Sequence, residues 1–457
     1  TGEYPARVVE RLKQLCAFGM KIPKEYGGLG FSQVEYDKVM HLIGTCDGNL
    51  GALLSAHQSI GVPQPLKMFG TDAQKKEWLP RCAKGAISGF ALTEPSVGSD
   101  PASLATTYEL TPDGQSYVIN GEKLWCTNGT IAELLVVMAR HPTTKKISAF
   151  VVEMSAEGVE VTHRCRFMGL TALANAVIRF TNVRVPKDNL IGGEGKGLKI
   201  ALTTLNTGRL ALPAASTGTA KVSLETARKW AKERVQWGRP IGKHEAIAHL
   251  LADMAATTFA MDSVSQVASQ LADRGGYDIR LEAAAAKEWN TTRCWYILDD
   301  TMQIRGGRGY EKETSLAARG ERPIGVERMF RDFRIDRIFE GSSEVMHLFI
   351  AREAVDTHLQ VAGSLIDPKA SFFSKIAALP KMVAFYARWY PARWIGWGAW
   401  PRYGEWGRLA RHVRFLDRTT RKLGRQIFHG MLVHQAKLQT KQAFLFRIVD
   451  IALELFA

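Results

Sequence analysis

Long apolar runs are missing from this 457-residue sequence, since no window of about 18 residues is both apolar and free of charge, and no transmembrane helix is predicted. Cysteine is scarce, and its six copies show no CxxC spacing, which indicates buried free thiols in a reducing compartment. No histidines and cysteines have the spacing of metal ligands, so no metal site is expected. The first residues, Thr1–Pro5, include neither a basic segment nor an apolar run, and no signal peptide is expected.

Acidic residues are few in the C-terminal part of the chain. Residues 361–457 hold sixteen Lys and Arg but five Asp and Glu, which is a net charge of +11 out of +15 for the whole sequence. A basic segment indicates an anionic partner, which can be a membrane surface, a nucleic acid or an acidic protein. Nucleic acid is the weakest interpretation because no recognition motif accompanies the charge.

The same segment holds five of the eleven tryptophans, and arginines alternate with them. Trp beside Arg is typical of sites at the lipid headgroup boundary, which predicts docking on a membrane surface. The alternative is a helical domain that packs these tryptophans against the bundle. Pro391 and Pro401 are expected to interrupt its helices. The tryptophans are Trp389, Trp394, Trp397, Trp400 and Trp406.

Periodicity divides the chain into four parts and predicts the α+β class. We expect an N-terminal helical domain at 1–89, a middle β-barrel or β-sandwich domain at 90–192, a C-terminal four-helix-bundle domain at 193–360 and a basic, Trp-rich helical extension at 361–457. The bundle would consist of three long helices and a fourth after Gly341. The three long helices are predicted at Leu198–Arg234, Ala246–Arg274 and Ile279–Arg305.

Two segments of the β region combine strand ends with polar loops. In Phe90–Asp100 an apolar stretch opens into a loop, where Thr93 and Ser99 offer hydroxyls and Gly98 permits close backbone approach to a ligand. In Lys123–Gly129 a tryptophan that can cover a planar ring precedes a threonine hydroxyl. Taken alone, the first segment is more simply a capped loop and the second a core tryptophan followed by a turn.

Two further segments lie in the helical region. Glu340 follows an apolar pair, Ile338 and Phe339, and precedes a flexible glycine and a helix start. A carboxyl beside apolar groups has a raised pKa and can act as a general base, although an isolated loop glutamate is more often solvated. The glycine loop Gln303–Tyr310 follows a helix and not a strand, so it is no Rossmann fingerprint.

Together these segments resemble the acyl-CoA dehydrogenase family of flavoenzymes, over about residues 20 to 360. The resemblance includes their order along the chain, Glu233–Gly238 and Arg331-Asp332 ahead of Glu340. His57–Gly61, Phe339 and the extension past residue 360 resemble the long- to very-long-chain branch.

The resemblance implies FAD as cofactor and a CoA thioester as substrate. It implies Glu340 as the catalytic base, which removes the α-proton while the β-hydrogen leaves as hydride to the flavin. In some relatives the base precedes the residue that matches Arg209, but Gly208 stands there and cannot serve. The substrate would contact Ser99, Asn206, Arg209 and Gly341. The implied cofactor-binding residues are Phe90, Leu92, Thr93, Gly98, Ser99, Trp125 and Thr127 from the β domain, Arg234, Trp237, His244, Gln303, Gly306 and Gly307 across a dimer interface, and Ser342 and Glu344 at the helix start.

The implied activity is α,β-dehydrogenation of a long acyl-CoA to the trans-2-enoyl-CoA, with electrons passed to an electron-transfer flavoprotein by a homodimer or a tetramer. Two alternatives remain, which are an oxidase or monooxygenase on the same fold and a membrane-complex scaffold with secondary activity. The compartment is open between a bacterial cytoplasm and a mitochondrial matrix, with peripheral attachment to the inner membrane as a further hypothesis.

Overall fold

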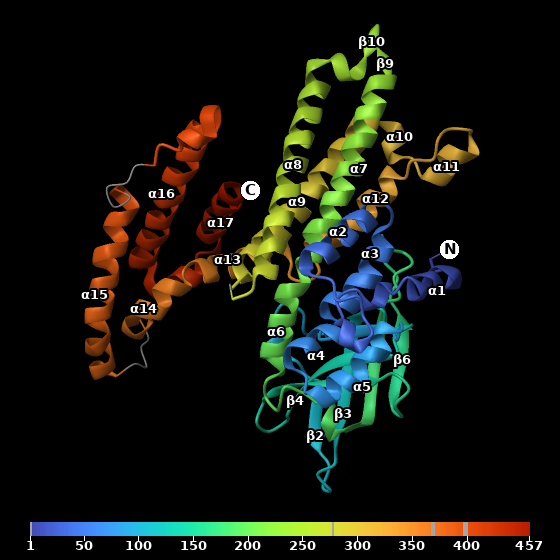
Figure 1. The fold of residues 1–457 in the computed structure, drawn as a ribbon, viewed down its shortest axis with the longest axis vertical. Helices are drawn as coiled ribbons and strands as arrows, with labels where there is room; N and C mark the ends of the chain where they lie inside the picture. The colour runs from blue at the N-terminus through green and yellow to red at the C-terminus, as the bar shows by residue number, and fades with distance from the viewer. Residues whose placement is uncertain (1, 277, 367–370, 396–400) are drawn as a thin grey trace. The chain divides into compact units, whose positions relative to one another are not determined.

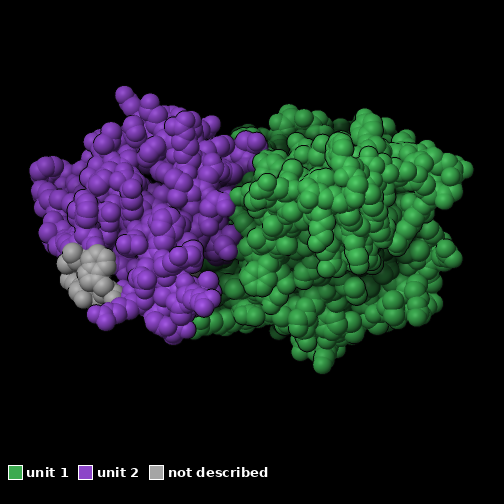
Figure 2. Space-filling model, turned by 90° about the horizontal axis from the view of Figure 1, so that it is seen from above, with its two compact units in different colours: residues 1–342 green, residues 343–457 purple. Residues whose placement is uncertain are grey.

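The structure, a computed structural model, describes residues 2–276, 278–366, 371–395 and 401–457. The chain divides into two compact units, residues 1–342 and 343–457 (Figures 1 and 2). Trp397 and Trp400 of the predicted tryptophan cluster lie outside the described residues. The expected domain limits at 89, 192 and 360 stay predictions.

Short helices form the beginning of the first unit. Ser32 and Thr71 each accept a backbone hydrogen bond from the third residue of the helix that follows, and Glu35 and Gln74 return the contact, so two capping boxes fix where α2 and α5 begin. A π-helical turn, Ala56–Ile60, continues α3. The helices are α1 Ala6–Gln14, α2 Gln33–Gly44, α3 Gly48–Ser55, α4 Pro63–Phe69 and α5 Asp72–Ala83.

An eight-stranded sheet follows, in the order β6-β7-β3-β2-β4-β5-β8, with β1 paired in parallel to β4. Side chains of β4 alternate between two cores: Leu134 and Val136 pack with α4 and α5, whereas Leu135 and Val137 pack with the aromatic core of the sheet. The sheet is therefore covered on both faces at β4. The strands are β1 Ser88–Ala91, β2 Thr107–Leu110, β3 Ser116–Cys126, β4 Leu134–Arg140, β5 Ile147–Glu153, β6 Val159–Arg164, β7 Ala176–Pro186 and β8 Leu190–Ile191.

Long helices form the remaining core of the first unit, and one prediction about them is wrong. The segment predicted as a single helix, Leu198–Arg234, forms two helices that are interrupted at Arg209-Leu210. Pro213 has no N–H to donate to the carbonyl of Arg209, so the hydrogen bond that would continue the helix is missing at this point. The helices are α6 Gly197–Gly208, α7 Ala211–Glu233, α8 Glu245–Arg274 and α9 Arg280–Arg305.

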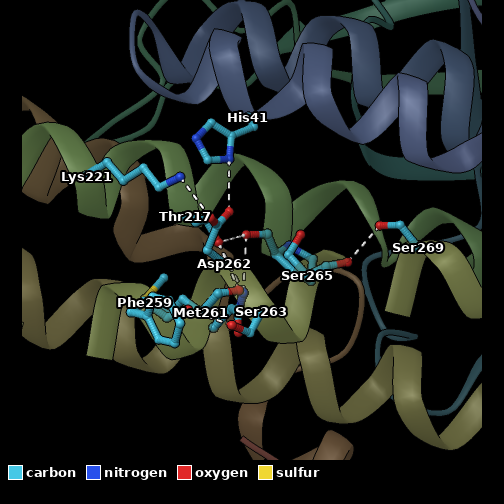
Figure 3. Close-up of polar contacts among 11 residues, drawn as sticks. His41, Thr217, Lys221, Phe259, Met261, Asp262, Ser263, Ser265 and Ser269 are labelled. Carbon is cyan, nitrogen blue, oxygen red and sulfur yellow. Dashed lines mark hydrogen bonds and ion pairs between the residues drawn. The ribbon is translucent and has the colours of Figure 1, made fainter. Parts of the chain in front are cut away.

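Close backbone contact and a polar cluster join α2, α7 and α8. A Cβ atom on Gly218 of α7 would lie 2.1 Å from the carbonyl oxygen of His41 in α2, so only glycine fits this crossing. Asp262 of α8 accepts a hydrogen bond from Lys221 at 3.0 Å and lies 3.9 Å from the His41 ring (Figure 3). These contacts fix the N-terminal helices on the long helices.

Smaller elements follow the ends of α7 and α9. The hairpin β9 Val235–Gln236 and β10 Arg239–Pro240 and the short helix α10 Gly307–Tyr310 lie at the end of the long helices that is far from the sheet (Figure 1). The segment that follows α10 contains α11, Glu313–Ala318, and α12 follows at Val326–Phe333. Arg308 anchors this loop through two hydrogen bonds to Glu321, at 2.6 and 2.7 Å.

The second unit is helical. Pro391 lies inside α15, so the prediction that it interrupts a helix is wrong. Trp389 packs on His358 and Phe428 within the second unit, whereas Trp394 and Trp406 are 54% and 52% exposed. The helices are α13 Ser343–Ala354, α14 Asp356–Ile366, α15 Phe372–Ile395, α16 Ala410–His434 and α17 Gln442–Phe456.

Two features of the described chain concern cysteine and membranes. All six cysteines are free thiols; Cys46 is exposed and Cys16 half-buried, which corrects the expectation that all are buried. Both lie in the short connections that follow α1 and α2. Among the described residues, no helix combines the length and the apolar character needed to cross a bilayer.

Candidate active site

Glu340 lies in a turn of unusual backbone conformation at the end of the first unit. A 3-10 helix, Arg334–Arg337, precedes it, and Glu340 and Gly341 both have positive φ angles, of 53° and 98°. A left-handed conformation at a residue other than glycine costs about 1–2 kcal/mol. Such a turn persists only where its surroundings hold it, and strained residues of this kind concentrate at functional sites.

Two cations hold the two carbonyls of this turn. Arg209, at the break between α6 and α7, donates from Nε to the carbonyl oxygen of Glu340 at 3.2 Å and from a terminal nitrogen to Asn206 Oδ1 at 2.8 Å. Lys287 of α9 donates from Nζ to the carbonyl oxygen of Gly341 at 2.7 Å. The structure thus joins Asn206, Arg209, Glu340 and Gly341, which the sequence predicts as site residues.

The Glu340 carboxyl is buried at one of its oxygens. Oε2 is closed to solvent and has no hydrogen-bond partner within the described structure. A Cβ atom on Gly208 would lie 3.7 Å from this oxygen and 2.6 Å from the Ile60 side chain. Burial raises the pKa of Glu340 to about 7, although the charges of Arg209 and Lys287 act against it. A carboxyl with this pKa can accept a proton at neutral pH.

The loop after β1 is fixed by an ion pair beneath it. Lys123 donates to Glu94 at 2.7 Å and to the carbonyl oxygen of Leu92 at 3.2 Å, and both charged side chains are buried. The backbone N–H of Leu124 donates to the carbonyl oxygen of Thr93 at 2.9 Å. Leu92 and Thr93 are therefore tied to β3. Of the other residues predicted in this loop, Phe90 is half-buried and Gly98 and Ser99 are exposed.

Trp125 and Thr127 lie together at the end of β3. Asn175 donates from one amide nitrogen to the carbonyl oxygen of Trp125 at 3.2 Å and to Thr127 Oγ1 at 3.3 Å. Trp125 has a φ of 55° and its side chain is 56% exposed, although the next residue of the strand, Cys126, is buried. The result is an uncovered indole beside a threonine hydroxyl, which suits a planar aromatic ligand.

A second group of predicted residues lies at the far end of the long helices (Figure 1). Three guanidinium groups lie over the ring of Trp230, with their central carbons 6.0, 5.2 and 5.3 Å from the ring centroid; they belong to Arg234, Arg305 and Arg308. The Trp237 ring meets the His244 ring edge-on at 5.6 Å. Gln303, Gly306 and Gly307 are exposed at the end of α9, and a Cβ atom on either glycine would meet nothing within 4 Å.

Within one chain, these two groups of predicted flavin residues do not meet. The residues of the loop after β1 and of the end of β3, called the sheet-end group, belong to the sheet, whereas those around the hairpin β9–β10 and at the end of α9 form the hairpin group. The sheet and the hairpin lie towards opposite ends of α7 (Figure 1). Ser342 is the last residue of the first unit and half-buried, and Glu344 is exposed in the first turn of α13 in the second unit.

Sequence reasoning missed Lys287, Asp336 and Asn175. Lys287 is fully buried, and its signal is a single lysine after four alanines, all of which are buried. Asp336 is buried four residues before Glu340, and burial raises its pKa to about 7. Asn175 carries no recognisable signal, because it acts on Trp125 from a loop 50 residues away.

Models of three domains of one family match the chain in succession. They are the acyl-CoA dehydrogenase N-terminal domain at residues 1–86, middle domain at 89–183 and C-terminal domain at 195–355. The chain belongs to the acyl-CoA dehydrogenase family. It is therefore an FAD-dependent oxidoreductase that acts on CH–CH groups, and the predicted α+β fold class is confirmed.

Individual acyl-CoA dehydrogenases extend this comparison. The probable acyl-CoA dehydrogenase FadE10 of Mycobacterium tuberculosis is 57% identical over 460 residues, which cover 100% of this chain and 71% of that protein. The human mitochondrial very long-chain specific acyl-CoA dehydrogenase is 38% identical over 349 residues, covering 74% of this chain and 52% of that protein, so the match spans about half of its length. An acyl-CoA dehydrogenase from Bacillus anthracis, solved in complex with FAD, has a TM-score of 0.82 at 28% identity, covering 98% of this chain and 74% of that one.

The residues of this acyl-CoA dehydrogenase fit a flavin. The uncovered indole of Trp125 offers a flat apolar surface, and Gly98, Gly306 and Gly307 border open space. The buried Oε2 of Glu340 has no hydrogen-bond partner within the described structure. A buried polar atom of this kind is open to contact with a bound molecule.

Proposed function

We propose that this acyl-CoA dehydrogenase introduces a trans-2 double bond into a long-chain acyl-CoA and passes the electrons to an electron-transfer flavoprotein. The observation that carries the proposal is the Glu340 carboxyl, which has a buried oxygen without a hydrogen-bond partner in the described structure and a pKa of about 7. A base with this pKa is half ionised near neutral pH and can remove the weakly acidic α-proton of a thioester.

Each residue around the carboxyl has a part in this chemistry. FAD, when bound, supplies the acceptor for the hydride that leaves the β-carbon. Glu340 takes the α-proton on Oε2, and its backbone N–H donates to the thioester oxygen, where negative charge develops. Loss of one such donor commonly costs about 3–4 kcal/mol of transition-state stabilisation. Arg209 and Lys287 favour the ionised form of Glu340 through their charges.

Three properties of the assembly belong to the same proposal. The long-chain substrate is supported by the identity to the very long-chain specific enzyme. A homodimer is supported by the separation of the two groups of flavin residues, because a second chain can bring its hairpin group to the sheet-end group of the first (Figure 1). Association of residues 361–457 with an anionic membrane surface is supported by exposed aromatic side chains, among them Phe372 and Phe373, on a basic segment.

The test is anaerobic reduction of the bound flavin by a series of saturated acyl-CoA thioesters of increasing chain length, followed by oxidation with an electron-transfer flavoprotein. We expect long chains to bleach the flavin fastest and the acceptor protein to restore its colour. Bleaching by short chains alone would contradict the substrate class. Rapid peroxide formation in air, without an acceptor protein, would show that the enzyme is an oxidase.

A further inference from the structure

Lys287 carries a buried ammonium group in the first half of α9. Its relative exposure is 0%, and the residues that precede it, Ala283–Ala286, are buried alanines. Removal of an ammonium group from water is expensive unless hydrogen bonds and opposite charges compensate. Nζ donates a hydrogen bond to the carbonyl oxygen of Gly341 at 2.7 Å, so the ammonium group binds the backbone of the turn that contains Glu340.

That turn needs an external support. Glu340 and Gly341 have φ angles of 53° and 98°, and each carbonyl accepts a hydrogen bond from a side chain. Arg209 holds the first carbonyl from the break after α6, and Lys287 holds the second from α9. Two separate helices thus clamp two consecutive peptide groups, which fixes the direction of the Glu340 side chain.

The charges near Lys287 give it a second effect on the same residue. Glu288 of α9, Asp336 of the 3-10 helix and Glu340 favour its charged form, whereas burial and Arg209 oppose it and leave its pKa lowered. In return, Lys287 lowers the pKa of Asp336 and of Glu340, which burial raises to about 7 in both residues. Without the ammonium group, Glu340 would keep the charge of Arg209, but Asp336 would lose the cation that lowers its pKa.

We propose that Lys287 is a positioning residue, which clamps the Glu340–Gly341 turn through the Gly341 carbonyl and keeps the Glu340 carboxyl ionised and aimed at the substrate. This inference rests on the proposed role of Glu340 as the base. It adds a group that does not touch the reacting atoms and acts through the backbone and the charge of the base.

The experiment uses the FAD-loaded enzyme and palmitoyl-CoA, with the rate of anaerobic flavin reduction measured from pH 5.5 to 9. Lys287→Met removes the charge and the hydrogen bond at similar volume, Lys287→Gln keeps a donor without the charge, and Lys287→Arg keeps both. Lys67→Met is the matched control, because Lys67 also donates to a backbone carbonyl, that of Lys21 at 2.7 Å, in a different part of the chain.

We expect Lys287→Met to reduce flavin at least about tenfold more slowly at pH 7 and to move the midpoint of the pH profile upward by about one unit. Lys287→Gln should show the shifted midpoint but recover much of the rate at high pH. Lys287→Arg should restore the original midpoint, and Lys67→Met should match the parent enzyme.

An unchanged midpoint in both Lys287→Met and Lys287→Gln would overturn the proposal. Loss of bound FAD or of cooperative unfolding in all three variants would also overturn it, because Lys287 would then serve the fold alone. Glu340→Gln is measured in parallel: if it still reduces its flavin, the proposed function itself fails, whereas an inactive Glu340→Gln beside a normal Lys287→Met refutes the positioning role alone.

Discussion

Lys123 and Glu94 form an ion pair of 2.7 Å whose side chains are almost closed to solvent. Burial works against the charge of Glu94, but Lys123 and two backbone N–H groups keep its pKa below the usual value. The pair lies under the loop that begins at Leu92, so it connects the stability of the sheet to the shape of the candidate flavin site.

Lys123→Met should therefore destabilise the protein by about 3–5 kcal/mol in urea unfolding, because it leaves the Glu94 carboxylate buried without its partner. The double variant Lys123→Met/Glu94→Gln should recover part of this loss. Arg81→Met is the control, since Arg81 forms an ion pair of equal length with Glu153 at the surface and should cost at most about 1 kcal/mol. Equal losses for Lys123→Met and Arg81→Met would contradict the account.

His57 predicts a pH dependence of stability. It is fully buried, its Nε2 lies 2.9 Å from the carbonyl oxygen of Phe18, and Nδ1 accepts from the backbone N–H of Ser88 at 3.0 Å. This pattern requires the neutral ring, and burial lowers the pKa of His57 from 6.5 to about 4. Between these values the unfolded chain binds a proton that the folded chain does not.

The free energy of unfolding should therefore fall as the pH falls from 6.5 towards 4, by about 3 kcal/mol from this residue. Measured by urea unfolding across this range, His57→Gln should show a shallower slope, and replacement of the exposed His249 by Gln should leave the slope as it is. A His57→Gln slope equal to that of the parent would show that another group sets the pH dependence.

Gly208 predicts a steric effect at the base. A Cβ atom there would lie 2.6 Å from the Ile60 side chain and 3.7 Å from Glu340 Oε2. Gly208→Ala must therefore displace the Ile60 side chain from its present position. We expect flavin reduction to slow roughly ten- to hundredfold with FAD still bound, because a displacement of about 1 Å near the reacting atoms has this effect. Gly208→Ala/Ile60→Ala, which removes the clashing Cγ2 atom of Ile60, should recover part of the activity.

Gly51→Ala is the control for this substitution. Gly51 is also helical, but its new Cβ would meet Ile43 at an ordinary 3.7 Å. Full activity of Gly208→Ala would mean that the space beside Glu340 is larger than the structure shows.

The sequence could single out Glu340 but not the residues that hold it. An apolar pair before it and a glycine and a helix start after it are local signals, and the resemblance to the acyl-CoA dehydrogenases implies its role as the base. Lys287 and Asn175 act on residues 54 and 50 positions away, and such contacts arise only when the chain folds. Pro391 shows the opposite failure, since α15 continues through a residue whose local effect is to break helices.

The second unit predicts binding to anionic lipid. Phe372 and Phe373 are 72% and 83% exposed at the start of α15, and burial of each ring is worth about 1.5–3 kcal/mol. Phe372→Ser/Phe373→Ser should therefore lower cosedimentation with phosphatidylglycerol vesicles at least about tenfold, whereas Leu42→Ser, at an exposed site in α2, should not. Equal sedimentation of all three proteins would exclude these rings as lipid contacts.

Glu340→Gln gives the most direct test of the central claim, that this carboxyl is the base of the reaction. The amide has nearly the same shape, so the variant should bind FAD and keep the yellow colour of the parent, but palmitoyl-CoA should fail to bleach it under anaerobic conditions. In the parent enzyme, the rate of bleaching should rise with pH through about 7, as Glu340 ionises. Bleaching of the Glu340→Gln flavin at the parent rate would contradict the account.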